Sequence, residues 1–111
     1  MLHFHLTRYW FDQYKNGFKS IEYRVATPRE ENLLNNQFAL VKFGDHISCR
    51  LYCGYPRKGD LDRILDGFVR GVRFVRLCDL PQAEKRFFLN KTDSVFCIND
   101  NTLFFAYELE F

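Results

Sequence analysis

The stretch GFKSIEYR, residues 17–24, marks the point where the spacing of the apolar residues changes from helical to extended. Before it, aromatic residues recur every three or four positions, as on one face of a helix, at Trp10, Phe11, Tyr14 and Phe18. After it, the side chains alternate as in a strand, with Ser20, Glu22 and Arg24 opposite Ile21, Tyr23 and Val25. Glycine commonly ends a helix, so Gly17 should close a helix over residues 8–16 and leave Lys19 in the connection.

The segments on either side of this junction extend the pattern. Residues 2–6 alternate between apolar and polar side chains, which predicts a half-buried strand. Thr27, Pro28 and Glu30 make a capping box with proline at the first helical position, so a short helix should begin at residue 28 and end near residues 35–36. The apolar run at residues 38–43 is expected to be extended, with a turn at Gly44 and Asp45.

The second half of the chain is mostly strand-like. We expect strands at residues 47–53, 68–77, 94–98 and 103–111, a helix at 81–88 and a turn at 99–101. Residues 54–66 should form a loop with room for one helical turn, and Gly71 predicts a bulge or sharp bend. The fold class is therefore α+β, one domain over residues 1–111 with a small curved sheet or barrel of five or six strands and two or three short helices.

Composition narrows the class of protein. A net charge of +2 with 27% charged residues does not match a strongly basic, non-specific nucleic-acid binder. The start MLHFH lacks the basic region of a secretory signal, so the four cysteines are interpreted as reduced cytoplasmic thiols. No apolar run reaches the length of a membrane span. His3 and His5 fit no zinc template, and neither a metal nor another cofactor is expected.

The charged residues of the opening stretch can form one cleft. Glu22 and Arg24 leave the same face of a strand roughly 7 Å apart, within reach of an ion pair. From the connection, Lys19 can turn to the same side and either contact phosphate or, if burial lowers its pKa, act as a base. A nearby Glu22 opposes that lowering, which favours binding over base catalysis. The alternative is a solvated surface pair of little energetic value.

Two further basic segments are candidates for nucleic-acid contacts. In the loop at residues 54–58, a base could stack on Tyr55 while Arg57 and Lys58 meet phosphate. The alternative is a basic turn that keeps the surface soluble.

The second basic segment lies on the strand expected at residues 68–77. Arg70 and Arg76 should share one face and Arg73 the other, unless the bulge at Gly71 brings them together. The alternative is a solvated strand face of mixed burial.

A strand, a helix with Trp10-Phe11 and then the motif GxKxxExR at residues 17–24 resemble the ASCH domain family of the PUA-like superfamily, in its small single-domain bacterial and phage form. Other matching features are the turn at Gly44-Asp45, Gly54-Tyr55 after a strand and the ending FFAYELEF. The resemblance implies a small PUA-like β-barrel with helices at its openings, a cleft beside the motif, and RNA recognition.

The resemblance also implies an enzyme activity as an alternative, since some ASCH members are enzymes. One ASCH type removes acetyl groups from acetylated cytidine, using the motif lysine, a threonine at the motif's acidic position and a later glutamate. Here Lys19 matches the lysine, Glu22 stands in place of the threonine, and Glu84 is a candidate for the later glutamate. Another type is reported as a ribonuclease with a tyrosine before the lysine, near which Tyr14 lies.

Three functions remain open at this point. The favoured one is an RNA- or nucleotide-binding domain whose ligand meets Lys19, Arg24, Tyr55, Arg57 and Lys58. The alternative is a small hydrolase acting on a modified nucleoside or on RNA, with Lys19 and Glu22 as the chemical pair. The third is an interaction protein without a nucleotide site.

Overall fold

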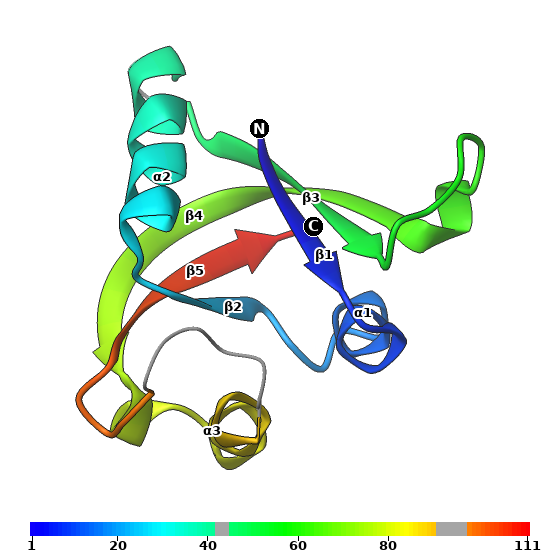
Figure 1. Cartoon of the computed structure of the whole chain (residues 1–111). Coiled ribbons are helices and arrows are strands. Elements are labelled where there is room, and N and C mark those ends of the chain that lie inside the picture. The colour runs from blue at the N-terminus through cyan, green and yellow to red at the C-terminus, as the bar shows by residue number, and fades with distance from the viewer. Residues whose placement is uncertain (42–44, 91–97) are drawn as a thin grey trace.

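A computed structural model describes residues 1–41, 45–90 and 98–111, and within these residues five strands form one curled sheet shaped like half a barrel (Figure 1). The order across the sheet is β1 (Leu2–Leu6), β3 (Ile47–Cys53), β4 (Ile64–Arg76), β5 (Leu103–Glu110) and β2 (Ile21–Val25). β1 and β3 run parallel, and the other neighbouring strands are antiparallel. The expected α+β class with a small curved sheet is confirmed.

The two edge strands of the sheet are bridged by Arg24 of β2. Its Nη2 donates to the His5 carbonyl of β1 at 3.4 Å, and its guanidinium carbon lies 5.2 Å from the centre of the Phe4 ring. Both contacts are made by a side chain that belongs to the charged motif. Arg24 therefore has a role in holding the open side of the half-barrel together.

The first helix begins at the predicted residue and ends one residue before the predicted end. α1 (Arg8–Lys15) is followed by Gly17, whose φ of 77° lies in the left-handed region that glycine adopts without strain. The chain then leaves the helix through Lys19 and enters β2 two residues later. The predicted helix-to-strand junction is confirmed.

The second helix is longer than predicted. In α2 (Pro28–Leu40) the hydroxyl oxygen of Thr27 accepts from the backbone N–H of Glu30 at 3.2 Å, as the capping sequence predicted. The predicted end near residues 35–36 and the extended run from residue 38 are wrong, because the helix continues to Leu40. Phe38 follows Leu34 by one helical turn on the same face and lines a surface cavity with Val41, although it is 56% exposed. Residues 42–44, including Gly44 of the predicted turn, lie outside the described residues.

The long strand β4 begins earlier than predicted. Residues 64–66, which were expected in a loop, pair with β3, because Asp66 meets Arg50 across the strands with an Nη2–Oδ2 distance of 3.0 Å. The rest of the expected loop contains one short 3₁₀ helix, η1 (Leu61–Arg63). The register of β4 against β5 shifts between Val69 and Gly71, which confirms the predicted bulge.

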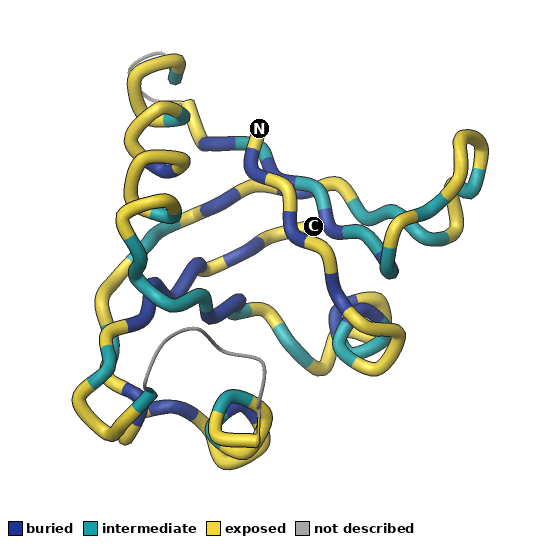
Figure 2. Tube along the Cα trace, viewed as in Figure 1, coloured by how far each residue is buried: buried dark blue, intermediate teal, exposed yellow. Residues whose placement is uncertain are grey.

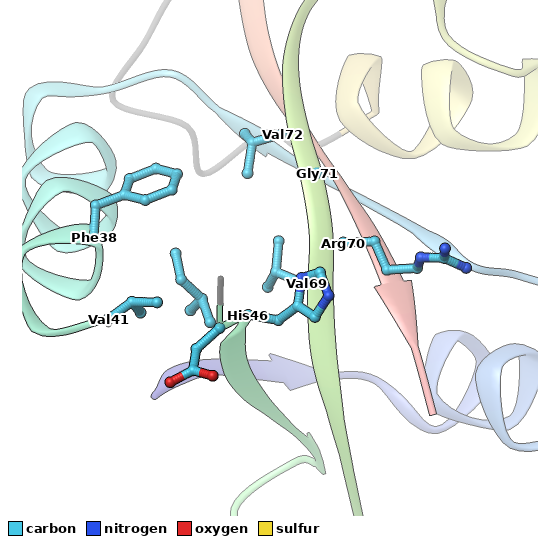
Figure 3. Close-up of a pocket in the computed structure, with 9 residues that line it drawn as sticks. Phe38, Val41, His46, Val69, Arg70, Gly71 and Val72 are labelled. Carbon is cyan, nitrogen blue, oxygen red and sulfur yellow. The ribbon is translucent and has the colours of Figure 1, made fainter. Parts of the chain in front are cut away.

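The bulge changes which arginines share a face. Arg70 turns away from Val69 and forms an ion pair with Glu110 at 3.3 Å on the outer face (Figure 3). Arg73 pairs in register with Ala106 and also lies on the outer face. The prediction that Arg70 and Arg76 share a face is therefore wrong, and the bulge instead places Arg70 with Arg73.

The remaining elements of the second half mostly follow the prediction. A 3₁₀ helix, η2 (Leu77–Asp79), precedes α3 (Gln82–Leu89), and β5 follows the turn at residues 99–102, where Thr102 N–H donates to the Asn99 carbonyl. The strand expected at residues 94–98 falls outside the described residues except for Ile98, which is not in a strand.

The core has two parts, one on each face of the sheet. Buried positions recur along the strands and also lie on the helices (Figure 2). The larger part fills the concave side, where Phe11 of α1 and Leu34 of α2 pack with Leu51 and Tyr107. The smaller part lies between the outer side of β2 and β5 and the segment around α3, and includes Tyr23, Leu80 and Phe104. No helix in the described residues is long and apolar enough to cross a membrane.

Candidate functional site: a charged cluster between α1, β2 and α3

Glu22 is the centre of a hydrogen-bonded cluster on the concave side of β2. It pairs in register with Tyr107 of β5, so its side chain points toward the larger core and is only 8% exposed. Tyr14 of α1 donates its hydroxyl proton to Oε1 at 2.8 Å, and Arg24 Nε donates to Oε2 at 2.8 Å. Both carboxylate oxygens therefore have a partner, as a nearly buried charge requires.

Lys19 joins this cluster from the connection between α1 and β2, as the sequence predicted. Its backbone N–H donates to the Gln13 carbonyl at 3.2 Å, which holds the connection against the end of α1. Its Nζ lies 3.9 Å from Glu22 Oε1 and donates to Glu84 Oε1 at 3.1 Å. The lysine side chain is 11% exposed, so these two carboxylates, not water, are its main polar surroundings.

Glu84 comes from the first turn of α3, far away in the sequence. The residue is one of two charged residues that are buried in the described part of the chain, and Glu22 is the other. A carboxylate in the first turn of a helix is stabilised by the helix dipole. The structure thus places next to Lys19 the acid for which only the family resemblance gave a signal.

Aromatic rings enclose the lysine head group. Its Nζ lies 4.5 Å from the centre of the Trp10 ring and 5.5 Å from the centres of the Tyr14 and Tyr23 rings. Ring faces attract cations, more strongly when the cation is shielded from water. Trp10 and Tyr23 were not among the predicted site residues, although the spacing of Trp10 and Tyr14 on one helix face was visible.

Burial controls the protonation of the two tyrosines in the cluster. Burial, reinforced by the neighbouring Glu22, raises the pKa of Tyr14 far above its ordinary value, so Tyr14 remains a hydrogen-bond donor. Burial and then the charge of Glu84 also raise the pKa of Tyr23. Neither phenol is therefore available as a phenolate at neutral pH.

The cluster is balanced in charge, since two cations, Lys19 and Arg24, face two anions, Glu22 and Glu84. A phosphate would have to compete with carboxylates that already occupy both cations. A ligand edge with its own donors and acceptors could instead exchange hydrogen bonds with the cluster without leaving a charge unpaired. The arrangement fits a polar, uncharged group better than an isolated phosphate.

The other predicted contact residues lie on the loop after β3. Tyr55 is 83% exposed and stacks on the His5 ring with 4.3 Å between ring centres. Arg57 and Lys58 are exposed, and no ion pair of either side chain is present among the described residues. No contact joins this loop directly to Lys19 in that part of the structure, but His5 links the two regions because its carbonyl accepts from Arg24.

The arginines of β4 are arranged differently. Arg70 pairs with Glu110, and Arg76 lies 3.9 Å from Asp79, so both are neutralised on the surface. Arg73 is exposed and lies in a cross-strand row with Ala106 and Tyr23. Its row therefore leads to Tyr23, one of the rings around the Lys19 head group.

A surface cavity lies elsewhere. It has a volume of about 210 Å³ and opens between the end of α2 and the strands β3 and β4, where Phe38, Val41, His46 and Val69 line it (Figure 3). None of its lining residues belongs to the charged cluster. In the described ranges, no group of three or more His, Cys, Asp or Glu side chains is placed to hold a metal ion.

Comparison with known proteins gives no independent evidence for a family or a function of this chain. No protein-family model, curated protein or solved structure matches the chain. The similarity to ASCH domains therefore rests on the motif at residues 17–24 and its flanking elements.

Proposed function

We propose that the protein is an RNA- or nucleotide-binding domain of the ASCH, PUA-like type, with the cluster around Lys19 as its recognition site. The observation that carries the proposal is the position of the Lys19 ammonium between two nearly buried carboxylates, Glu22 and Glu84, that come from different elements. Three residues of the cluster, Lys19, Glu22 and Arg24, belong to the motif, and the resemblance implies a cleft beside that motif.

The free-energy cost of burying these four charged side chains indicates a functional reason for the cluster. Taking charges out of water is costly, and apolar side chains of similar volume often give equal or better stability. A cluster of two acids and two bases at the edge of the core therefore suits ligand recognition better than packing alone. Lys19 and Arg24 offer N–H donors, and Glu22 and Glu84 offer acceptors, which together complement the mixed donors and acceptors on a nucleobase edge.

A second candidate is a small hydrolase acting on an acylated cytidine or on RNA, and the contact between Lys19 and Glu84 favours it. The deacetylating ASCH type combines these two residue types, and here they lie 3.1 Å apart. In the deacetylation, Glu84 would take a proton from the attacking water, and Lys19 would give a proton to the departing cytidine amine. Glu22 replaces the threonine of that type, and its two carboxylate oxygens already accept hydrogen bonds from Tyr14 and Arg24. Binding therefore remains the primary proposal.

Trp10 provides the test, because it is the sole tryptophan and lies on the lysine head group. We expect its fluorescence to change when a short RNA or a nucleoside is added, and we expect about tenfold weaker binding in Lys19→Ala, equal to the loss of about 1.4 kcal/mol. Lys15→Ala, which removes an exposed lysine from the end of α1, is the matched control and should bind like the wild type.

Each alternative gives a different result in the same series. Release of cytidine from acetylated cytidine that is abolished in Glu84→Gln and Lys19→Ala, with an unchanged circular dichroism spectrum, would establish the hydrolase. No fluorescence change and no binding at millimolar ligand would reject both nucleotide functions and leave the interaction protein.

A further inference from the structure

A column of aromatic and imidazole rings stands on the outer face of β1 and β3. β1 alternates buried and exposed residues, with His3 and His5 exposed. The parallel register places His3 beside Arg50 and His5 beside Tyr52, so these four side chains share the outer face. The pairing of β1 with β3 was not predicted, and the column was therefore not visible in the sequence.

The rings of the column are close to parallel. The ring centres are 5.8 Å apart for His3 and Tyr52, 4.5 Å for Tyr52 and His5, and 4.3 Å for His5 and Tyr55. The corresponding angles between ring planes are 25°, 12° and 19°. These values are typical of stacked rings, so the order along the column is His3, Tyr52, His5 and Tyr55.

Hydrogen bonds fix the column before any ligand arrives. His3 Nδ1 and the Tyr52 hydroxyl share a hydrogen bond of 2.8 Å, and His5 Nδ1–H donates to the Gly54 carbonyl at 2.8 Å. Gly54 has a φ of 67°, a conformation that glycine adopts without strain, and it turns the chain so that Tyr55 reaches the His5 ring. A preformed surface loses little side-chain entropy when a ligand binds.

The column ends on a free ring face. His5 covers one face of Tyr55, and among the described residues no other ring contacts it. Tyr55 is 83% exposed, and the exposed cations Arg57 and Lys58 follow directly in the loop. The only acid that contacts this segment in that part of the structure is Asp60, which accepts from the Arg57 backbone N–H and leaves both cationic side chains without a carboxylate partner.

We propose that a base of single-stranded nucleic acid stacks on the outer face of Tyr55 and continues the column, while the adjoining phosphates lie against Arg57 and Lys58. Flat rings with a free face suit a nucleobase, and the neighbouring cations suit a polyanion and disfavour a basic or purely apolar partner. A duplex fits less well because its bases are already stacked on each other. This surface shares the nucleic-acid ligand of the proposed function but does not depend on the Lys19 cluster.

The proposal is tested with a short oligouridylate, whose bases stack weakly on each other, at low salt. We expect the Tyr55 ring and His5 imidazole resonances to shift on titration. Tyr55→Ala should bind about tenfold more weakly, as the loss of one base–aromatic stack implies, and Tyr55→Phe should keep nearly full affinity. Phe74→Ala removes another exposed ring, 63% exposed on β4, and should bind like the wild type.

The outcomes separate this surface from the lysine cluster. Shifts at Tyr55 and His5 without a change in Trp10 fluorescence support the column and count against the Lys19 site. A Trp10 response with unshifted Tyr55 and His5, or a Tyr55→Ala variant that binds as well as the wild type, overturns the column and leaves the Lys19 site standing. Equal binding of a duplex of the same length, or an equal loss of affinity in Phe74→Ala, also overturns the column.

Discussion

The ion pair between Lys19 and Glu84 should couple much more strongly than an exposed pair of the same length. The two side chains are 11% and 12% exposed, and their charged atoms are 3.1 Å apart. At an effective dielectric constant of about 20, the attraction at this distance is about 5 kcal/mol, and desolvation of both charges offsets a large part of it. We therefore expect a net coupling free energy of about 2 kcal/mol, within the range found for residues in direct contact.

A double-mutant cycle measures this coupling. Lys19→Met should lower the free energy of unfolding by about 3 kcal/mol, because it leaves Glu84 without its cation and weakens the surroundings of Glu22. Glu84→Gln should cost less, since Lys19 keeps Glu22 at 3.9 Å. The double variant should be less destabilised than the sum of the two by about 2 kcal/mol.

Urea unfolding gives the required free energies, provided that the dependence on denaturant is unchanged among the variants. The matched control is the pair of Arg70 and Glu110, with a separation of 3.3 Å and side chains that are 61% and 58% exposed. Its coupling should not exceed about 0.5 kcal/mol. Equal coupling in the two cycles would show that burial does not strengthen the Lys19 pair, and the reasoning would be refuted.

Three other predictions concern the core. Gly67→Ala should destabilise the protein by at least about 2 kcal/mol, because the added Cβ would meet the Glu110 carbonyl oxygen and the sheet would have to shift. Urea unfolding measures this loss, and an unchanged midpoint would contradict the prediction. Burial raises the pKa of Tyr14 in the folded state, so this residue contributes stability below pH about 10 that is lost as the pH rises further; wild type and Tyr14→Phe should therefore lose stability to different extents in alkaline solution. Burial raises the pKa of Cys49 to about 11, whereas Cys78 is exposed. Peptide mapping after alkylation at pH about 8 should therefore find Cys78 modified before Cys49, and equal rates would contradict the buried position of Cys49.

The local features of the fold could be predicted from the sequence. The change of period at residues 17–24 predicted the end of α1, the start of β2 and the position of Lys19 between them. The capping sequence predicted the start of α2 but not its end, because Asn35 and Asn36 are poor helix formers and yet the helix runs through them to Leu40. Gly71 predicted the bulge, whereas the pairing of Asp66 with Arg50, which extends β4, required knowledge of the neighbouring strand.

The site depended more on contacts between distant segments. Glu22 and Arg24 were placed on one face by alternation alone, and the structure has them hydrogen-bonded to each other. The meeting of Lys19 with Glu84 joins a connection to a helix that lies more than half the chain away, and no local pattern encodes such a contact. The ring column likewise required the parallel pairing of β1 with β3, since alternation identifies the face of each residue but not the neighbour across the sheet.

The position of β5 in the sheet has a consequence for how the protein folds during synthesis. β5 is the last of the five described strands in chain order, yet it lies between β4 and β2 and pairs with both. When β2 leaves the ribosome it therefore has no neighbour in the sheet, and Glu22 has no Tyr107 beside it, until nearly the whole described chain has been made. Such non-local pairing slows folding, and we expect nascent chains to expose aromatic segments that chaperones recognise until β5 is inserted.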